Sequence, residues 1–222
     1  GSSPTAPLYD LIDFAGAILC PTSTDISRLS TTWTASWWQG TLAQAALTAN
    51  PHRFAILAGA VLITDGRLIH DYDGTIVRNS ALTLPQGFRA EKCLIFGDLA
   101  FIYGANIGGG ETYVYTWSRT ASSYIARYPV GDTEVLTGWV SDSVYIVTKK
   151  GLIKRFTGTG FSEDFADGGQ QFPTAEAQLS INAIHPNGVS VAENIVKILV
   201  DFGVIANERL VSGIWNFDMS TR

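Results

Sequence analysis

The sequence of 222 residues predicts an all-β fold, either a β-propeller or part of one. Three observations support this fold class: short apolar runs with a period of two residues, turn signals between the runs, and a repeat of roughly 40 residues. A helical repeat would instead need a period of about 3.6 residues through each unit. Because four short strands at this spacing are typical of propeller blades, we expect about five blade-like units.

The repeat is clearest around four aromatic residues, each of which ends an alternating apolar run and precedes a polar turn. We expect these aromatics to be the structural anchors of the repeat: Tyr72, Trp117, Phe156 and Phe217. A second apolar run lies upstream of each anchor, and turn residues such as Asp65-Gly66 separate the two runs. An Asp-Gly pair between two apolar runs is a strong hairpin signal. Each unit is therefore predicted to alternate strands and tight turns.

The chain is predicted to form a single propeller-like domain over residues 1–222, because one blade cannot bury both of its faces alone. Its expected parts are an irregular first unit at 1–50, regular repeats at 54–161, an inserted loop at 163–192 and a last unit at 193–222. A short helix is expected inside the insertion at 174–179, and a turn at Pro186-Asn187-Gly188. Such insertions often lie on a binding face. The last unit has no sequence for an outermost strand. We therefore expect an N-terminal strand to complete it, or the chain to be a segment of a larger protein.

Composition and charge exclude some functions. Charged residues make up 16% of the chain, below the roughly 25% of average soluble domains, so much of the surface is expected to be buried. The net charge is −5, whereas nucleic-acid binders usually carry a basic patch. One compact basic cluster, Lys149, Lys150, Lys154 and Arg155, is interpreted as a solvated hairpin. We expect no nucleic-acid partner, and no membrane span because no apolar run approaches about 18 residues.

The sequence contains no recognisable catalytic or metal-binding motif. The three histidines, His52, His70 and His185, share no local pattern, and no serine nucleophile elbow or phosphate-binding loop is present. The acidic pair Asp71 and Asp73 is interpreted as part of a turn rather than a calcium loop, because no downstream glutamate completes the pattern. We therefore predict that the chain is not an enzyme and holds no metal and no cofactor.

The two cysteines, Cys20 and Cys93, lie far apart in the sequence, and each has apolar neighbours. This setting favours buried free thiols. A disulfide between them stays open, because the geometry that it requires cannot be judged from sequence.

A cluster of tryptophans lies in the first unit. Trp33, Trp37 and Trp38 are close together, whereas the other tryptophans occupy repeat-related strand positions. Large aromatic side chains dominate cores and interfaces, and sugars stack on their faces. We interpret the cluster as core or subunit interface, with a ligand platform as the alternative.

The segment 208–218, whose sequence is ERLVSGIWNFD, together with the irregular repeats, resembles structural proteins of tailed bacteriophages. The resemblance covers residues 54–222. It implies a component of the virion, in the tail or its nozzle, whose partners are other virion proteins or copies of itself and which contacts a host-surface glycan or protein. It supplies no catalytic residue. The alternative is a propeller module that binds protein or glycan ligands.

Overall fold

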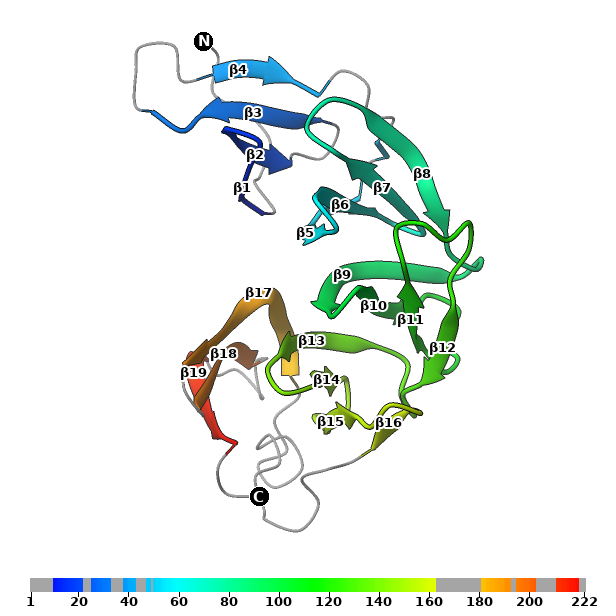
Figure 1. Cartoon of the computed structure of the whole chain (residues 1–222). Helices are drawn as coiled ribbons and strands as arrows, with labels where there is room; N and C mark the ends of the chain where they lie inside the picture. The colour runs from blue at the N-terminus through cyan, green and yellow to red at the C-terminus, as the bar shows by residue number, and fades with distance from the viewer. Residues whose placement is uncertain are drawn as a thin grey trace. The chain divides into compact units, whose positions relative to one another are not determined.

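The computed structural model describes residues 10–21, 25–32, 38–42, 47–48, 50–162, 181–192, 195–202 and 211–219. Within these ranges, every regular element is a β-strand, and the strands form five sheets (Figure 1). Each strand pairs with the next strand along the chain, so each sheet uses one continuous stretch of sequence. This local pairing confirms the predicted all-β fold of about five blade-like repeats.

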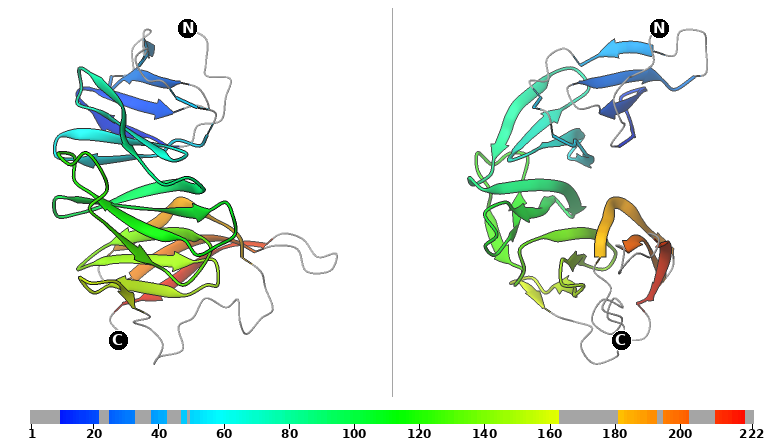
Figure 2. Two further views of the ribbon diagram at one scale, coloured as in Figure 1. Left: turned by 90° about the vertical axis from the view of Figure 1, so that its right-hand side faces the viewer. Right: turned by 180° about the vertical axis from the view of Figure 1, so that it is seen from behind.

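Four sheets have four strands and one has three. The first contains β1 (Ile12–Phe14), β2 (Ala17–Pro21), β3 (Ile26–Ser30) and β4 (Trp38–Thr41). The second contains β5 (Phe54–Leu57), β6 (Ala60–Asp65), β7 (Leu68–Tyr72) and β8 (Val77–Thr83). The third contains β9 (Phe88–Phe96), β10 (Leu99–Asn106), β11 (Tyr113–Trp117) and β12 (Ala126–Pro129). The fourth contains β13 (Val135–Val140), β14 (Val144–Thr148), β15 (Ile153–Phe156) and β16 (Phe161–Ser162). The fifth contains β17 (Ile181–Ala192), β18 (Ile195–Phe202) and β19 (Val211–Asp218), which Figure 2 shows from two further sides.

The chain divides into two compact units, one of residues 1–103 with 115–127 and one of residues 104–114 with 128–222. In each unit, side chains from two consecutive sheets form a shared apolar core. The core of the first unit contains Leu19, Ile26, Leu42, Phe54, Val61, Ile63, Tyr72 and Val77. The core of the second contains Leu136, Trp139, Tyr145, Val147, Ile153, Val196, Ile198 and Met219. Consecutive sheets thus cover faces that a single sheet would leave in water.

The four aromatic anchors lie in the third strand of four different sheets. Tyr72 is in β7, Trp117 in β11, Phe156 in β15 and Phe217 in β19. In three of these sheets the anchor pairs with the second residue of the preceding strand, through Val61↔Tyr72, Ala100↔Trp117 and Val196↔Phe217. The sequence repeat therefore corresponds to a repeated strand register.

The irregular part expected at 1–50 contains a regular four-stranded sheet, β1 to β4. Its apolar residues 14–19 form a hairpin and not one strand, because the chain reverses at Ala15 and Gly16, whose φ angles are 52° and 75°. Ala58 and Gly59, between β5 and β6, have φ angles of 48° and 71°. Positive φ at both central residues is the two-residue hairpin turn that suits the twist of paired strands. The first and second sheets therefore begin with the same hairpin.

The expected inserted loop extends less far than residue 192. Residues 181–192 form strand β17, which pairs with β18 along its length. The sequence suggested a turn here because it contains Pro186-Asn187-Gly188, but the register instead shifts between Ile184 and Val189. A bulge of this kind lets a strand contain residues that break regular pairing. The short helix expected at 174–179 lies outside the described residues.

Candidate functional site

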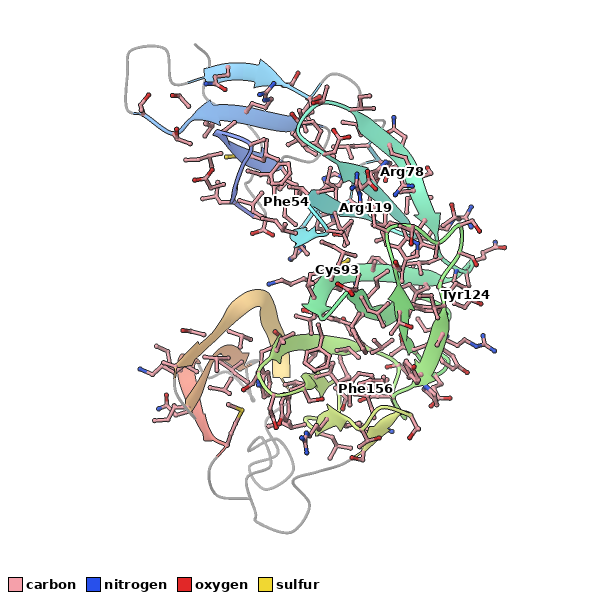
Figure 3. The ribbon with its side chains drawn as sticks, viewed as in Figure 1. Phe54, Arg78, Cys93, Arg119, Tyr124 and Phe156 are labelled. Atoms are coloured by element: carbon pink, nitrogen blue, oxygen red, sulfur yellow. The ribbon has the colours of Figure 1, made fainter. Side chains whose placement is uncertain are left out.

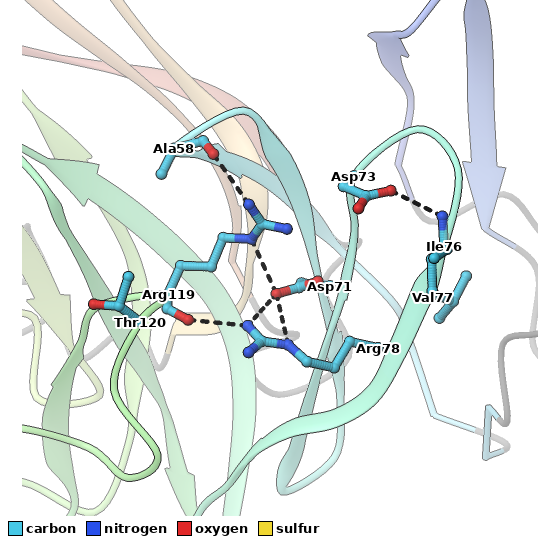
Figure 4. Close-up of a pocket in the computed structure, with 8 residues that line it drawn as sticks. All are labelled: Ala58, Asp71, Asp73, Ile76, Val77, Arg78, Arg119 and Thr120. Atoms are coloured by element: carbon cyan, nitrogen blue, oxygen red, sulfur yellow. Dashed lines mark hydrogen bonds and ion pairs between the residues drawn. The ribbon is translucent and has the colours of Figure 1, made fainter.

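A pocket of about 760 Å³ lies in the first unit (Figure 4). Three segments line it: the β5–β6 turn with Ala58, the β7–β8 hairpin from Asp71 to Arg78, and the loop after β11 with Arg119 and Thr120. These segments are far apart in the sequence. Only the stacking of the second and third sheets brings them together.

Asp71 holds the charged side of the pocket together. Its side chain is only 2% exposed, yet its Oδ2 accepts hydrogen bonds from two arginines. Nε of Arg78 and Nε of Arg119 each donate to this oxygen at 3.1 Å, and Nη2 of Arg78 donates to it as well. Figure 3 shows the two arginines beside one another. One buried carboxylate thus holds two guanidinium groups that would otherwise repel each other.

Arg78 is held on several sides. It is the cross-strand partner of Asp71 in the β7–β8 pairing. Its guanidinium carbon lies 5.9 Å from the centre of the Trp117 ring, within range of a cation–π interaction. Its Nη2 also donates to the backbone carbonyl of Arg119 at 3.0 Å. Arg78 is therefore fixed although its side chain is 48% exposed.

Arg119 is positioned by a folded loop. Nε1 of Trp117 donates to the carbonyl of Ala121 at 2.9 Å, and the Ala121 N–H donates to the carbonyl of Ser118 at 2.9 Å. Nη1 of Arg119 then reaches across to the carbonyl of Ala58 at 3.3 Å. The Arg119 side chain is 27% exposed and lines the pocket.

The β7–β8 turn supplies the apolar side of the pocket. Oδ1 of Asp73 accepts the backbone N–H groups of Thr75 and Ile76, both at 2.8 Å. The hydrogen bonds from Ile76 and Thr75 lower the pKa of Asp73, and the charge of Arg119 lowers it further. This hydrogen-bonded turn presents the Ile76 side chain with 60% of its surface exposed. The turn thereby places an exposed apolar side chain beside the charged groups of the pocket.

The charged groups of the pocket are ordered by one another and by the backbone. Its carboxylates accept hydrogen bonds from arginine or from backbone N–H groups. A pre-ordered pair of arginines suits the recognition of an anionic group.

A second polar cluster, which the sequence motifs do not indicate, surrounds Asp65 at the end of β6. The Thr48 N–H donates to Oδ2 of Asp65 at 2.7 Å, and Nδ2 of Asn50 lies 3.2 Å from Oδ1. Nε2 of His52 and Nε2 of His70 each lie 3.4 Å from the carboxylate. Burial alone would raise the pKa of Asp65, but the hydrogen bonds from His52, His70 and Thr48 outweigh it and hold the pKa well below its usual range. No sequence motif links the two histidines. They lie side by side only because the chain folds around Asp65.

This cluster stabilises the fold and does not face a substrate. The side chains of His52, His70 and Asp65 are at most 1% exposed. The cluster joins the segment before β5, the β6–β7 turn and strand β7 around one ionised group. No group of three or more histidine, cysteine, aspartate or glutamate side chains within the described ranges is arranged to hold a metal ion.

The basic cluster is only partly solvated. Lys149 is 49% exposed, and its Nζ lies 2.9 Å from Oε2 of Glu134. Arg155 pairs with Oδ2 of Asp142 at 3.0 Å. Lys154, in contrast, is 8% exposed, so it does not belong to a solvated hairpin as expected.

The other candidates from the sequence are the two cysteines, the tryptophan cluster and His185. Cys20 and Cys93 are free and buried, which confirms the predicted thiols, and burial raises the pKa of Cys93 to about 12. Trp33 and Trp37 lie outside the described residues, and Trp38 is in β4. His185 lies within β17.

In the part of the chain that the structure describes, no helix has the length and apolar character needed to cross a membrane.

Comparisons with known proteins identify the architecture. No protein-family model and no curated protein matches this chain by sequence. The WD40 domain of Neurospora crassa Pan2 matches with a TM-score of 0.63 and 10% identity, over 99% of this chain and 66% of that chain. The fold is that of a β-propeller.

Two further structures agree with this fold. The WD40 repeats of RRP9 match with a TM-score of 0.60 and 11% identity, over 94% of this chain and 63% of that chain. A structure of S. cerevisiae Dbp5 bound to Nup159 and Gle1 matches with a TM-score of 0.57 and 10% identity, over 98% of this chain and 59% of that chain. The chain thus spans less than two thirds of the length of each of these three matches.

Proposed function

We propose that this chain is a non-catalytic interaction module that binds a segment of a partner protein at the pocket formed by Ile76, Arg78 and Arg119. One observation carries the proposal. A pocket of about 760 Å³ combines a 60% exposed isoleucine with two arginines held by a buried aspartate. Arginine is enriched in protein interfaces, and a small number of interface residues carry most of the binding energy.

The order of the site supports this function. The turn at Asp73 and the loop before Arg119 are hydrogen-bonded internally, so little conformational entropy is lost when a partner binds. The fold supports it too. WD40 propellers are among the structures with this architecture, and one similar structure is a complex of Dbp5 with Nup159 and Gle1.

The finer assignment, a component of a phage tail with a place in the virion, stays a prediction from the sequence. The same holds for virion proteins or further copies of this chain as partners, and for a host-surface glycan. The similar structures named above do not bear on these assignments. The mass of the native protein in solution, measured by light scattering, tests self-assembly separately from the pocket.

The experiment that tests the proposed function is selection from a random-peptide display library on the immobilised protein, followed by affinity measurement of the enriched peptides. The pocket variant is Ile76→Ser, and the matched control is Ile107→Ser, because Ile107 is 68% exposed but does not line the pocket. We expect Ile76→Ser to weaken binding by about fivefold or more. If no peptide is enriched, or if the two variants bind enriched peptides equally, the proposed function is wrong.

A further inference from the structure

We infer that the pocket recognises one carboxylate, the side chain of an aspartate or glutamate in the partner segment, at the free edges of Arg78 and Arg119. This inference rests on the proposed function and adds the chemistry of the ligand. It follows from the hydrogen-bonding capacity of the two arginines, from the charges around them and from the apolar residue beside them.

The two arginines have donors to spare. A guanidinium carries five N–H groups in a fixed fork. Arg78 uses Nε and Nη2, and Arg119 uses Nε and Nη1. Among the described residues, neither Nη1 of Arg78 nor Nη2 of Arg119 has a hydrogen-bond partner. Because the Asp71 side chain is almost wholly buried while both arginine side chains are partly exposed, the accessible side of this cluster is positive and rich in donors.

The acidic side chains limit the negative charge of the ligand. Asp71 and Asp73 line the same pocket as the two arginines and offset their positive charge, so the attraction for an anion is confined to the partly exposed arginine side chains. Asp73 is exposed and would repel a dianion such as a phosphate group. The whole chain carries −5, which also opposes a polyanion such as nucleic acid. A carboxylate carries one charge and matches the planar fork of arginine.

The apolar residue indicates that the carboxylate belongs to a peptide. Ile76 and Val77 line the pocket next to the arginines, and Ile76 is 60% exposed. A free small acid would leave this apolar surface in water. A peptide can place an apolar side chain on Ile76 while its neighbouring acidic side chain reaches the guanidinium edges.

The first experiment uses the intact protein with three small probes: N-acetyl-glutamate methylamide, its glutamine counterpart and inorganic phosphate. The ¹⁵N NMR signals of the arginine Nε–H groups report binding. We expect the signals of Arg78 and Arg119 to shift with the glutamate probe and to respond about tenfold more weakly to the glutamine probe. Equal response to both probes, stronger binding of phosphate, or no shift at all would overturn the inference.

The second experiment uses peptides enriched by display, each compared with a version in which its acidic residue is replaced by the amide. Arg119→Gln should weaken the acidic peptide about tenfold and leave its amide version unchanged. Arg119→Lys keeps the charge and should lose less. The matched control is Arg89→Gln, since Arg89 is 41% exposed, pairs with Glu91 and does not line the pocket.

The two proposals fail differently. If peptides bind in an Ile76-dependent manner but tolerate the change from acid to amide, the ligand class is wrong and the interaction module stands. If binding does not depend on Ile76, the proposed function itself fails. Thermal unfolding of each variant shows whether Arg119→Gln is folded, and the probe titration of the unmodified protein needs no variant.

Discussion

Replacing Asp65 by alanine should destabilise the protein more than the loss of any exposed acidic residue. Asp65 is about 1% exposed and accepts hydrogen bonds from Thr48 and Asn50, with His52 and His70 both 3.4 Å from its carboxylate. The substitution leaves these buried groups facing a small apolar side chain. They cannot reach water to replace the lost hydrogen bonds.

The expected magnitude follows from this burial. Each buried group left without a hydrogen bond costs about 1–3 kcal/mol, and more where the lost bond was to a charged group such as the Asp65 carboxylate. Several such groups face Asp65 and their costs overlap, so we expect a loss of about 3–5 kcal/mol in the free energy of unfolding. In a chain of this size the melting temperature should fall by about 6–20 °C.

The assay is urea unfolding at neutral pH, with thermal unfolding as a second measurement. The control is Asp73→Ala, because Asp73 also has a lowered pKa but is exposed and bonded only within its own turn. Asp65→Asn, which keeps the shape and removes the charge, provides a measurable variant if the alanine form does not fold. Should Asp65→Ala lose no more stability than Asp73→Ala, the argument from burial is refuted.

The contribution of Asp65 also depends on pH. Its folded-state pKa lies below the ordinary value of 3.8 that applies to the unfolded chain. The stabilisation is therefore fully present above about pH 4 and is lost as the pH falls below that value. The difference in stability between the unmodified protein and Asp65→Ala should shrink with falling pH over this range.

The structure also predicts the effects of two other substitutions and the reactivity of one cysteine. Gly66 and Gly97 both have φ of +59°, but a Cβ on Gly66 would lie 2.8 Å from Nδ2 of Asn50, whereas a Cβ on Gly97 would meet nothing within 4 Å. Gly66→Ala should therefore lower the free energy of unfolding, measured with urea, by about 1 kcal/mol more than Gly97→Ala. Equal losses would contradict this. Trp117→Ala should cost about 3–5 kcal/mol because the ring is fully buried, and calorimetry that finds less than half of this would contradict the packing. Iodoacetamide at about pH 8 should leave Cys93 unmodified in the folded protein and alkylate it in denaturant, as mass spectrometry can show. Burial raises the pKa of Cys93 from an ordinary 9.0 to about 12. The protein should therefore lose stability as the pH rises from 9 towards 12.

The sequence was sufficient to predict the strands of the regular repeats at 54–161 and their grouping. Period-two apolar runs and the Asp65-Gly66 turn predict hairpins between neighbouring segments. Strands β6 and β7 form such a hairpin, in which Asp65 pairs with Leu68 beside the turn and Val61 pairs with Tyr72 at the far end. Such pairings are local, so the residues that form them are neighbours in the chain. The strand at 181–192 was not predicted, because Pro186-Asn187-Gly188 resembles a turn and a bulge has no separate sequence signal.

Only the tertiary structure decided where the chemistry of this protein lies. Asp71, Arg78 and Arg119 look like unrelated turn and strand residues in the sequence, and Arg119 is 48 positions from Asp71. Likewise, His52 and His70 flank Asp65 only after strands β6 and β7 have folded against the segment before β5. Period and turn patterns describe contacts within one sheet. Both polar clusters instead depend on how separate segments pack together, and packing at that distance leaves no periodic trace in the sequence.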